Sequence, residues 1–289
     1  MTLDDPLEKV AWLHPPELGG WEYLIADRSR RLWTVYHETY TLCSGIHLRG
    51  QSWRYRGRTY IRLNPGMMLM EPGELHRTLS VPQGAQFKVA QIPPADVARA
   101  AMELGLTGDV HLRRAETDDP ALTAAVWRLG EVAEYGGATS LEVQTLQAAV
   151  LRHMLSHAER LPHAPQADGF VAAGLARDYL RDHRCEPVTL DELAAVAKVG
   201  RFQLLRAFRG RFGVPPHAYQ TQLRIERARD LLRKGTPPAF VSVETGFYDQ
   251  SHFGRHFRKI LGVTPSEYAR GHSRRTILSG ASMVRLGAI

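Results

Sequence analysis

Short β-rich runs separated by turn residues fill the first half of the chain. The stretch from Tyr40 to Leu63 is YTLCSGIHLRGQSWRYRGRTYIRL, and apolar and polar side chains alternate within SWRYR and TYIRL. Alternation with a period of two is typical of a strand with one buried face. Glycines interrupt the runs, and two Pro-Gly pairs flank the apolar run Met67–Met70. Several short strands at this spacing predict a small β-sandwich or barrel.

Helical periodicity replaces the alternation after Ile92. PADVARAAMELG and DPALTAAVWRLGEVAEYG have apolar positions three and four apart and end at glycines. The longer run TSLEVQTLQAAVLRHMLSHAERL predicts a helix from Thr139 to Leu161. A polar segment with two prolines follows at residues 162–169. We predict a domain boundary there.

The rest of the chain has helical patterns in short pieces. VTLDELAAVAKVG is predicted to form a helix capped by Thr189, and RFQLLRAFRGRFG a second helix. A longer helix is predicted over Pro216–Arg233, where prolines precede it and Gly235 follows. The pair of short helices then recurs in PPAFVSVETG and DQSHFGRHFRKILG. The C-terminal half therefore contains an internal repeat.

The two copies of the repeat share their key positions. LAAVAKVGRFQLLRAFRGRFGVPPHAY aligns with FVSVETGFYDQSHFGRHFRKILGVTPSEY, so that Arg206 corresponds to Arg255. A helix-turn-helix needs a first helix as support and a second helix with a polar, basic outer face. Both copies meet this requirement. Their apolar anchors are Leu204 and Phe208 in the first copy and Phe253 and Phe257 in the second.

Charge is divided unevenly between the two halves. Residues 1–169 contain 17 Lys and Arg against 20 Asp and Glu, a net charge of −3, whereas residues 170–289 contain 20 against 10, a net charge of +10. The asymmetry predicts an anionic partner for the C-terminal half, and DNA, RNA and an acidic membrane all qualify. The composition is that of a folded protein, without a membrane span, signal segment or cysteine framework. We expect a cytoplasmic protein.

Two histidines in the second copy raise the alternative of a metal site. His252 and His256 lie four residues apart and would share one face of a helix, which suits zinc. A hydrolytic zinc site would need Glu after the first histidine, where the chain has Phe253, and no cysteine is near. We therefore interpret the stretch as a basic recognition helix and predict neither a metal nor a cofactor.

The same stretch resembles the signature of the AraC/XylS family of bacterial transcription regulators. The resemblance covers residues 170–270 and implies seven helices, in which the long helix separates two helix-turn-helix units that each meet a major-groove segment of DNA. RNA readers usually present aromatic platforms on a sheet, and neither these nor a membrane-surface helix is visible. The resemblance implies a DNA-binding regulator and no enzyme. It is carried by Gly246, Phe247, Asp249, Gln250, Ser251, His252, Phe253, Arg255, Phe257, Gly262, Val263 and Pro265.

Helix geometry then predicts which side chains face DNA. Asp249 is the expected N-cap of the second recognition helix, and the free N–H groups that follow it favour phosphate. Glutamine pairs with adenine, and arginine with guanine or phosphate. Phe202 and Leu205 cannot donate hydrogen bonds, so the first copy is expected to read a thymine methyl or mainly to position the protein. The predicted DNA-binding residues are Arg201, Phe202, Leu205, Arg206 and Arg209, and Gln250, Ser251, Gly254, Arg255 and Arg258.

The strand-rich half resembles the cupin-like, sugar-sensing domain found in part of this family, through LRGQSWRYRGRTYIRLNPGMMLMEPGELHR. A cupin enzyme holds its metal with a His-x-His pair, a Glu and a later His, and only His76 is in place here. A metal-dependent cupin enzyme fused to a DNA-binding domain and an effector-independent regulator are the alternatives. The resemblance favours a barrel that binds a small effector. The candidate effector-binding residues are His76, Thr78, Trp53 and Tyr55, with the aromatic pair as either a stacking wall or plain core.

The predicted fold is α+β. A cupin-like β-barrel with helices for effector binding and dimerisation is expected over residues 1–165, an all-α tandem helix-turn-helix domain over 166–272, and a tail over 273–289. The predicted partners are double-stranded DNA, a small-molecule effector with a sugar-like compound as one candidate, RNA polymerase and a second copy of the chain, but no membrane. The helix Thr139–Leu161 either pairs the two copies or simply packs on the barrel.

Overall fold

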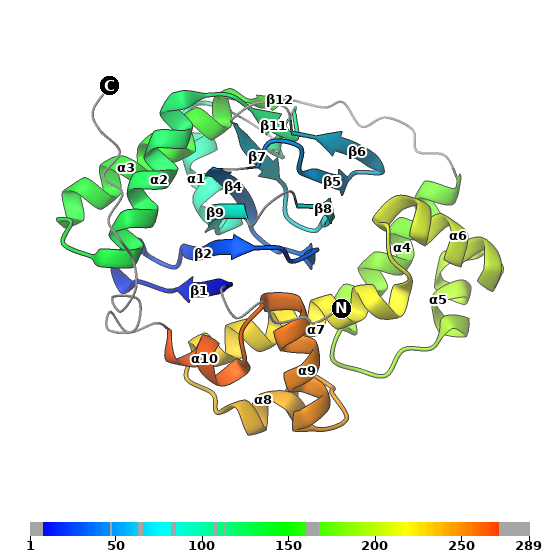
Figure 1. Cartoon of the computed structure of the whole chain (residues 1–289). Coiled ribbons are helices and arrows are strands. Elements are labelled where there is room, and N and C mark those ends of the chain that lie inside the picture. The colour runs from blue at the N-terminus through cyan, green and yellow to red at the C-terminus, as the bar shows by residue number, and fades with distance from the viewer. Residues whose placement is uncertain are drawn as a thin grey trace.

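The computed structural model describes residues 8–46, 48–62, 66–81, 85–106, 109–112, 114–159 and 168–271. A strand-rich N-terminal part lies beside an all-helical C-terminal part (Figure 1). Helix α7 (Pro216–Arg233) runs along the boundary between the two parts. The predicted α+β fold is confirmed.

The strands of the N-terminal part form two main antiparallel sheets instead of one closed barrel. One sheet has six strands in the order β1-β2-β9-β4-β7-β11, and the other has four in the order β3-β8-β5-β6. Strands β10 and β12 form a separate short pair. The bounds are β1 (Lys9–Leu13), β2 (Glu22–Ser29), β3 (Thr34–Tyr36), β4 (Tyr40–Ile46), β5 (Ser52–Tyr55), β6 (Arg58–Ile61), β7 (Met67–Met70), β8 (Leu75–Ser80), β9 (Ala85–Ile92), β10 (His111–Leu112), β11 (Glu116–Thr117) and β12 (Ala158–Glu159).

The central strands of the larger sheet are covered on both faces. All four side chains of β7 are buried, which explains why its sequence, MMLM, has no polar position. One face packs against helices α1 (Pro94–Glu103), α2 (Pro120–Tyr135) and α3 (Ser140–Ser156). The other face contributes to clusters with the smaller sheet and with the C-terminal part. A single-turn 3-10 helix, η1 (Pro16–Leu18), precedes β2.

Helix α3 packs inside its own domain. Its N-cap, Thr139, accepts a hydrogen bond from the Glu142 N–H at 3.2 Å, and the helix ends at Ser156 and not at residue 161. Val150 and Met154 are fully buried in the cluster shared with α2. These two side chains are therefore unavailable to a second chain. The formation of a homodimer stays a prediction.

The C-terminal part has the architecture expected from the sequence. Its described residues form seven helices, the number that the family resemblance implied, and α7 has the predicted bounds. We call α5 with α6 the first unit and α8 with α9 the second unit. The bounds of the other helices are α4 (Asp168–Asp182), α5 (Leu190–Ala197), α6 (Arg201–Phe212), α8 (Pro238–Glu244), α9 (Gln250–Leu261) and α10 (Pro265–Arg270).

Helix α7 fixes the two units relative to each other. The Arg224 guanidinium donates hydrogen bonds to the carbonyl oxygens of Arg184 at 3.0 Å and Glu186 at 2.9 Å, ahead of the first unit. The same guanidinium donates to the Gly246 carbonyl at 2.7 Å, inside the second unit. Gly246 has φ +74°, and an added Cβ would lie 2.1 Å from the Cys185 carbonyl oxygen, so only glycine fits this close approach. One arginine thus connects the segment ahead of the first unit with the turn inside the second unit.

Some predictions fall on residues that the structure does not describe. The proposed boundary at 162–169 lies mostly outside the described residues, and the tail at 273–289 lies wholly outside them. The division into domains at those positions stays a prediction. Among the helices of the described ranges, none combines the length and apolarity that crossing a membrane requires.

Candidate DNA interface and effector pocket

Helix α9 presents a basic face because its apolar side is held inside the domain. Asp249 accepts a hydrogen bond from the His252 backbone N–H at 2.6 Å, which confirms the predicted N-cap. Phe253 and Phe257 are fully buried, as predicted, and Ile260 continues their side of the helix. The helix can therefore rotate little without opening the core.

The predicted DNA-binding residues of α9 lie on the opposite side. Gln250, Ser251, Arg255 and Arg258 are exposed, and Gly254 is half-buried. Gln250 and Ser251 occupy the first turn, where free N–H groups and the positive end of the helix dipole favour phosphate. Arg255 is one turn further along. This arrangement can place a glutamine and an arginine at base edges in a major groove.

Helix α6 has the same plan with weaker polar chemistry. Leu204 and Phe208 are fully buried, whereas Phe202 is 83% exposed and Leu205 is half-buried. Arg201, Arg206 and Arg209 are exposed, and Arg201 forms an ion pair with Asp191 of α5. All five predicted DNA-binding residues of this helix lie away from its core, with Leu205 the least exposed. The N-cap is Gly200, without a side-chain hydrogen bond.

The histidine pair of α9 packs against an aromatic ring. The His252 and His256 ring centroids are 4.6 Å apart in an edge-on arrangement, and each ring also lies near Phe247. Burial lowers the pKa of His256, and the neighbouring His252, Lys259 and Arg255 lower it further. Within the described residues, no group of three or more His, Cys, Asp or Glu side chains is arranged to hold a metal ion.

A pocket lies between the two sheets of the N-terminal part. The space has a volume of about 590 Å³, part of which is open to solvent. Most of its wall is apolar or aromatic, including Trp12, Met70 and Phe87. A concave, mainly apolar space with a few polar groups is the usual form of a small-molecule site. Its polar wall residues are His37, Thr41, Gln51, His76, Thr78 and Gln91.

Two of the four predicted effector-binding residues line this pocket, namely His76 and Thr78. Trp53 and Tyr55 point inward, as the strand alternation predicted, and are almost completely buried. They belong to a neighbouring cluster with β7, where the Trp53 indole donates to Glu116 at 3.0 Å. The structure therefore places the aromatic pair in core packing, outside the pocket wall.

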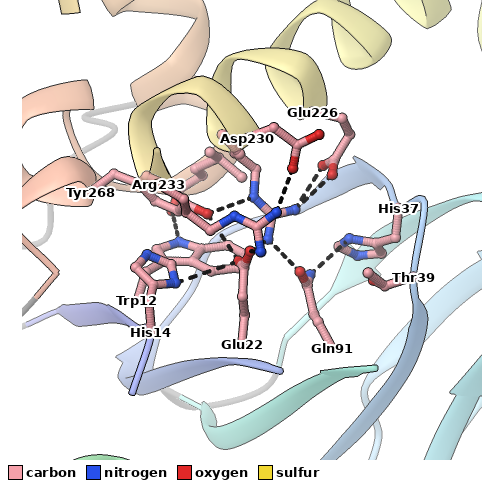
Figure 2. A network of polar contacts seen from close by, with 12 residues as sticks. Trp12, His14, Glu22, His37, Thr39, Gln91, Glu226, Asp230, Arg233 and Tyr268 are labelled. Carbon is pink, nitrogen blue, oxygen red and sulfur yellow. Dashed lines mark hydrogen bonds and ion pairs between the residues drawn. The ribbon is translucent and has the colours of Figure 1, made fainter. Parts of the chain in front are cut away.

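A buried polar cluster joins the two parts of the chain (Figure 2). It comprises Glu22, Gln91, Glu226, Arg229 and Tyr268, and Arg229 at its centre is 2% exposed. The Arg229 Nη1 donates to both Glu226 carboxylate oxygens, at 2.9 and 2.8 Å, and Nη2 donates to Glu22 and Gln91. Its Nε donates to the Tyr268 hydroxyl at 3.1 Å. The guanidinium thus has partners from both parts of the chain, as a buried charge requires.

The carboxylate of Glu22 stays ionised in this cluster. Burial would raise the pKa of Glu22, but nearby positive charge, with Arg229 foremost, lowers it below its usual value. Arg233 contributes a second cation, with its Nη1 2.8 Å from a Glu22 oxygen. The Tyr268 hydroxyl donates to Glu22 at 2.9 Å. Strand β2 is thereby connected to α7 and α10.

The pocket and the polar cluster share a hydrogen-bonded chain. The Gln91 amide oxygen accepts from Arg229, so its NH₂ group is the one that donates to His37 Nδ1, at 2.9 Å. Burial, foremost, together with the charges of His76 and Arg229 holds the pKa of His37 well below its usual value. The neutral ring accepts at Nδ1 and therefore carries its proton on Nε2. Both His37 and Gln91 line the pocket, so a bound molecule would contact two side chains that lead directly to α7.

Comparisons with known proteins identify the C-terminal part. Residues 193–271 match a family described as "Helix-turn-helix domain". The chain is 27% identical over 228 residues to the uncharacterized HTH-type transcriptional regulator YbfI of Bacillus subtilis, covering 75% of this chain and 79% of that one. It is 31% identical over 163 residues to a putative AraC-like transcription regulator of Streptomyces antibioticus, covering 52% of this chain and 53% of that one.

Solved structures extend the likeness in fold to the N-terminal part. An apo variant of ToxT from Vibrio cholerae superposes with a TM-score of 0.54 at 15% identity, covering 88% of this chain and 98% of that one. ToxT solved with an unsaturated fatty acid has a TM-score of 0.51 at 14% identity, covering 94% and 98%. The chain is thus similar to AraC-like transcription regulators over part of its length, and its C-terminal part carries a helix-turn-helix domain. At this identity the ToxT structures establish the fold alone.

Reasoning from the sequence missed the residues that connect the pocket to the helix-turn-helix part of the chain. Gln91 lies near the end of an apolar strand, AQFKVAQI, and a buried glutamine in such a run is a signal that a polar partner is present. Arg229 carries no comparable signal, because its helix holds several arginines that look alike in sequence context. Only the folded arrangement shows which arginine is buried.

Proposed function

We propose that this chain is an AraC-like regulator that binds its DNA site with sequence specificity and that a small molecule in the pocket controls this binding. The observation that carries the proposal is the chain from the pocket through His37 and Gln91 to Arg229 of α7. Through Arg224, helix α7 also holds the segment ahead of the first helix-turn-helix unit and the turn inside the second. A change at the pocket wall would therefore act on the element that sets the spacing of both recognition helices.

The DNA-binding half of the proposal is supported by the exposed faces of α6 and α9. Arg206 and Arg255 occupy equivalent exposed positions in the two units, and α9 adds Gln250 at its N-terminus. Two recognition helices on one rigid spacer fit two major-groove segments about one helical turn apart, which is roughly 34–36 Å. Binding should weaken strongly with added salt, because lysine and arginine displace counterions from phosphate.

Control of DNA binding by a ligand depends on the coupling between the two binding equilibria. A ligand changes DNA affinity only when it binds one arrangement of the two parts better than another. A molecule that accepts a hydrogen bond from His37 or displaces the Gln91 amide would alter the partners of Arg229. Because the Arg229 charge is buried, losing a partner is costly, and α7 would shift to recover one.

The experiment compares the full chain with a Gln91→Leu variant. A duplex site is first selected from a randomised pool, and small molecules are screened for those that raise the melting temperature. In the natural protein a true effector should change DNA affinity by about 5-fold or more. Gln91→Leu should still bind that compound but should lose most of the change in DNA affinity.

The matched control is Gln86→Leu on the same strand. Gln86 lies outside the pocket wall, and its amide contacts Asp27 at 3.4 Å. This variant should respond to the effector like the natural protein. If Gln91→Leu also keeps the full response, the proposed connection through Gln91 is wrong. If no compound that binds the pocket changes affinity or site geometry on DNA, the control of binding by an effector is wrong.

A further inference from the structure

Four polar side chains in or beside the pocket are buried with atoms that lack a partner. In the described part of the chain, no hydrogen bond reaches Trp33 Nε1, Gln51 Oε1, His76 Nδ1 or either terminal nitrogen of Arg62. The residues are 9%, 6%, 9% and 3% exposed, respectively. Buried polar atoms are paired in the great majority of folded proteins. Their concentration at one cavity indicates a site that a ligand completes.

Arg62 points into the space between the sheets. Ser52 pairs with Ile61, and the Arg62 N–H donates to the Gln51 carbonyl at 2.9 Å, so Arg62 lies opposite Gln51 on the neighbouring strand. Ile61 is 59% exposed, and strand alternation turns the next side chain to the other, inner face. Gln51 shares that face and lines the pocket. The guanidinium therefore lies beside the pocket wall.

The charge of Arg62 acts on the facing sheet. Burial raises the pKa of the Cys43 thiol to about 11, and the positive charge of Arg62 opposes that rise. Cys43 belongs to β4 and lines the pocket. No acidic side chain contributes to the wall among the described residues. Arg62 is thus a buried cation beside an apolar cavity, and none of the ion pairs found in the described ranges includes it.

We propose that the pocket binds a small, largely apolar compound with one carboxylate, which Arg62 holds. Arginine donates two parallel hydrogen bonds to a carboxylate, and a charge-assisted pair is the strongest way to satisfy a buried guanidinium. The Trp33 indole supplies a further donor, whereas Gln51 Oε1 is the one unpaired group that can only accept. The apolar remainder of the ligand matches Trp12, Met70 and Phe87. A sugar carries hydroxyls on most of its carbons and would place some of them against the apolar part of the wall, where no group can bond them.

This inference rests on the proposed function only in treating the ligand as the effector. The probes are two carboxylates, octanoate and 3-phenylpropanoate, each paired with the alcohol of the same skeleton. Binding to the full chain is measured by tryptophan fluorescence and by melting temperature. We expect at least one carboxylate to bind about tenfold or more tightly than its alcohol, since a charged hydrogen bond at a dry site contributes that much.

The variant Arg62→Met should remove this preference and weaken carboxylate binding about tenfold. It should fold at least as stably as the natural protein without ligand, because it removes a buried unpaired charge. Arg62→Lys keeps the charge and should retain part of the preference, which separates loss of the charge from loss of the fold. Arg54→Met changes an exposed arginine on β5 and should bind every probe like the natural protein.

Equal binding of alcohol and carboxylate, failure of both carboxylates to bind, or unchanged binding by Arg62→Met would each overturn the proposal. DNA affinity, measured with the same probes, keeps the two proposals apart. If the carboxylate binds through Arg62 without changing DNA affinity, the ligand class stands and control by the effector fails. If an alcohol binds better and changes DNA affinity, control stands and the ligand class fails.

Discussion

The second helix-turn-helix unit packs against the wall of the pocket between the sheets, whereas the first does not. Phe253 and Phe257 of α9 belong to one hydrophobic cluster with Trp12, Trp33 and Phe87, and these three line the pocket. The Trp12 indole also donates to the Leu261 carbonyl at the end of α9, at 3.0 Å. The core that positions the second recognition helix is therefore continuous with the wall that a ligand would touch.

The first unit belongs to a different cluster. Leu204 and Phe208 of α6 pack with the helices around them and meet the N-terminal part through Tyr36 and Leu75. Neither of those two residues lines the pocket. A further contact is the Tyr219 hydroxyl, which donates to the Gly73 carbonyl at 3.2 Å. The two units share one arrangement of helices but pack against different residues of the N-terminal part. We expect a ligand to act first on the second unit.

The largest effect is expected from removing an anchor of the second unit. Phe257→Ala should lower the free energy of unfolding by about 3–5 kcal/mol, because it leaves a cavity in a fully packed core. The variant should lose binding to its own site and to random DNA together. It should also change the near-ultraviolet signal of the tryptophans and weaken ligand binding, since Trp12 and Trp33 share its cluster.

The matched change in the first unit is Phe208→Ala. It should cost a similar amount, about 3–5 kcal/mol, but leave ligand binding and the tryptophan signal nearly unchanged. Phe240→Ala is the surface control, because that ring is 66% exposed. Equal loss of ligand binding in Phe257→Ala and Phe208→Ala would show that the two clusters are not separate in solution.

The next effect concerns reading of the DNA sequence by the second unit. Arg255→Ala should cost about 1–3 kcal/mol at the selected site and less on random DNA, relaxing the preference at one position. Arg206→Ala in the first unit should weaken all sequences about equally and reduce the salt slope by about one. The difference is expected because α9 begins with Gln250 and Ser251, whereas α6 begins with an arginine paired to Asp191 and an exposed Phe202.

Selection from randomised sites decides this prediction. The natural protein and each variant are selected in parallel at one salt concentration. If Arg255→Ala selects the same sequence as the natural protein, Arg255 is a phosphate contact and does not read a base. Gln250→Ala provides an internal check, because it should relax a different position and more mildly.

The helices of the DNA-binding part were predictable from the sequence because their rules are local. The bounds of α7, the N-caps Thr189 and Asp249, and the inward position of Phe253 and Phe257 all follow from periodicity and capping chemistry, and the structure confirms them. The repeat supplied a second copy of each signal. Predictions of this kind hold in the folded protein because a cap or a helical period depends only on residues a few positions apart.

The pocket was not predictable to the same degree because its wall is assembled from distant strands. Trp12 and Gln91 lie on the edge strand β1 and the inner strand β9 of the larger sheet, and Gln51 precedes β5 of the smaller sheet, so no periodicity links them. Strand alternation correctly predicted that Trp53 and Tyr55 point inward. It does not predict whether an inward side chain lines the pocket or joins the neighbouring hydrophobic cluster, as these two do. The prediction of a closed barrel was wrong for a similar reason. Alternation shows which face of a strand is buried, but it does not show which strand lies beside it.

Acid should weaken the contact between the N-terminal part and α10, the helix that follows the second unit. His14 lies against α10, with its ring 4.7 Å from the Tyr268 ring and its Nδ1 3.8 Å from Glu22. Burial, as the largest cause, lowers the pKa of His14 to about 4. The unfolded chain therefore takes up a proton first, and stability is lost as the pH falls from about 6.5 towards 4. Between pH 7 and 5 the loss should be about 1–2 kcal/mol.

His14→Gln isolates this contribution in denaturant titrations at both pH values. The comparison with this variant is needed because a second group changes the stability in the opposite sense. Burial raises the pKa of Glu226 to about 7, so Glu226 contributes more stability as the pH falls. The stability that protonated Glu226 contributes is present at low pH and is lost as the pH rises through 7. His14→Gln should lose about 1–2 kcal/mol less than the natural protein on acidification. Equal losses would show that His14 titrates normally in the folded protein.

The smallest effects are expected at the N-caps of the two recognition helices. Asp249 caps α9 with a side-chain hydrogen bond, whereas Gly200 begins α6 without one. Asp249→Ala should cost about 1 kcal/mol of stability, and Asp249→Ser should cost little because serine caps as well. Gly200 has φ −67° and no atom within 4 Å of an added Cβ, so a serine fits there without strain.

Gly200→Ser should therefore raise stability by a few tenths of a kcal/mol, through a new hydrogen bond to the first turn of α6. Thermal unfolding of the two serine variants and of Asp249→Ala measures both caps on one scale. If the first unit mainly positions the protein, as one of its two predicted roles has it, DNA selection should be unchanged in Gly200→Ser. A changed sequence preference in this variant would mean that the start of α6 reads bases, and the contrast between the two units would then be one of degree only.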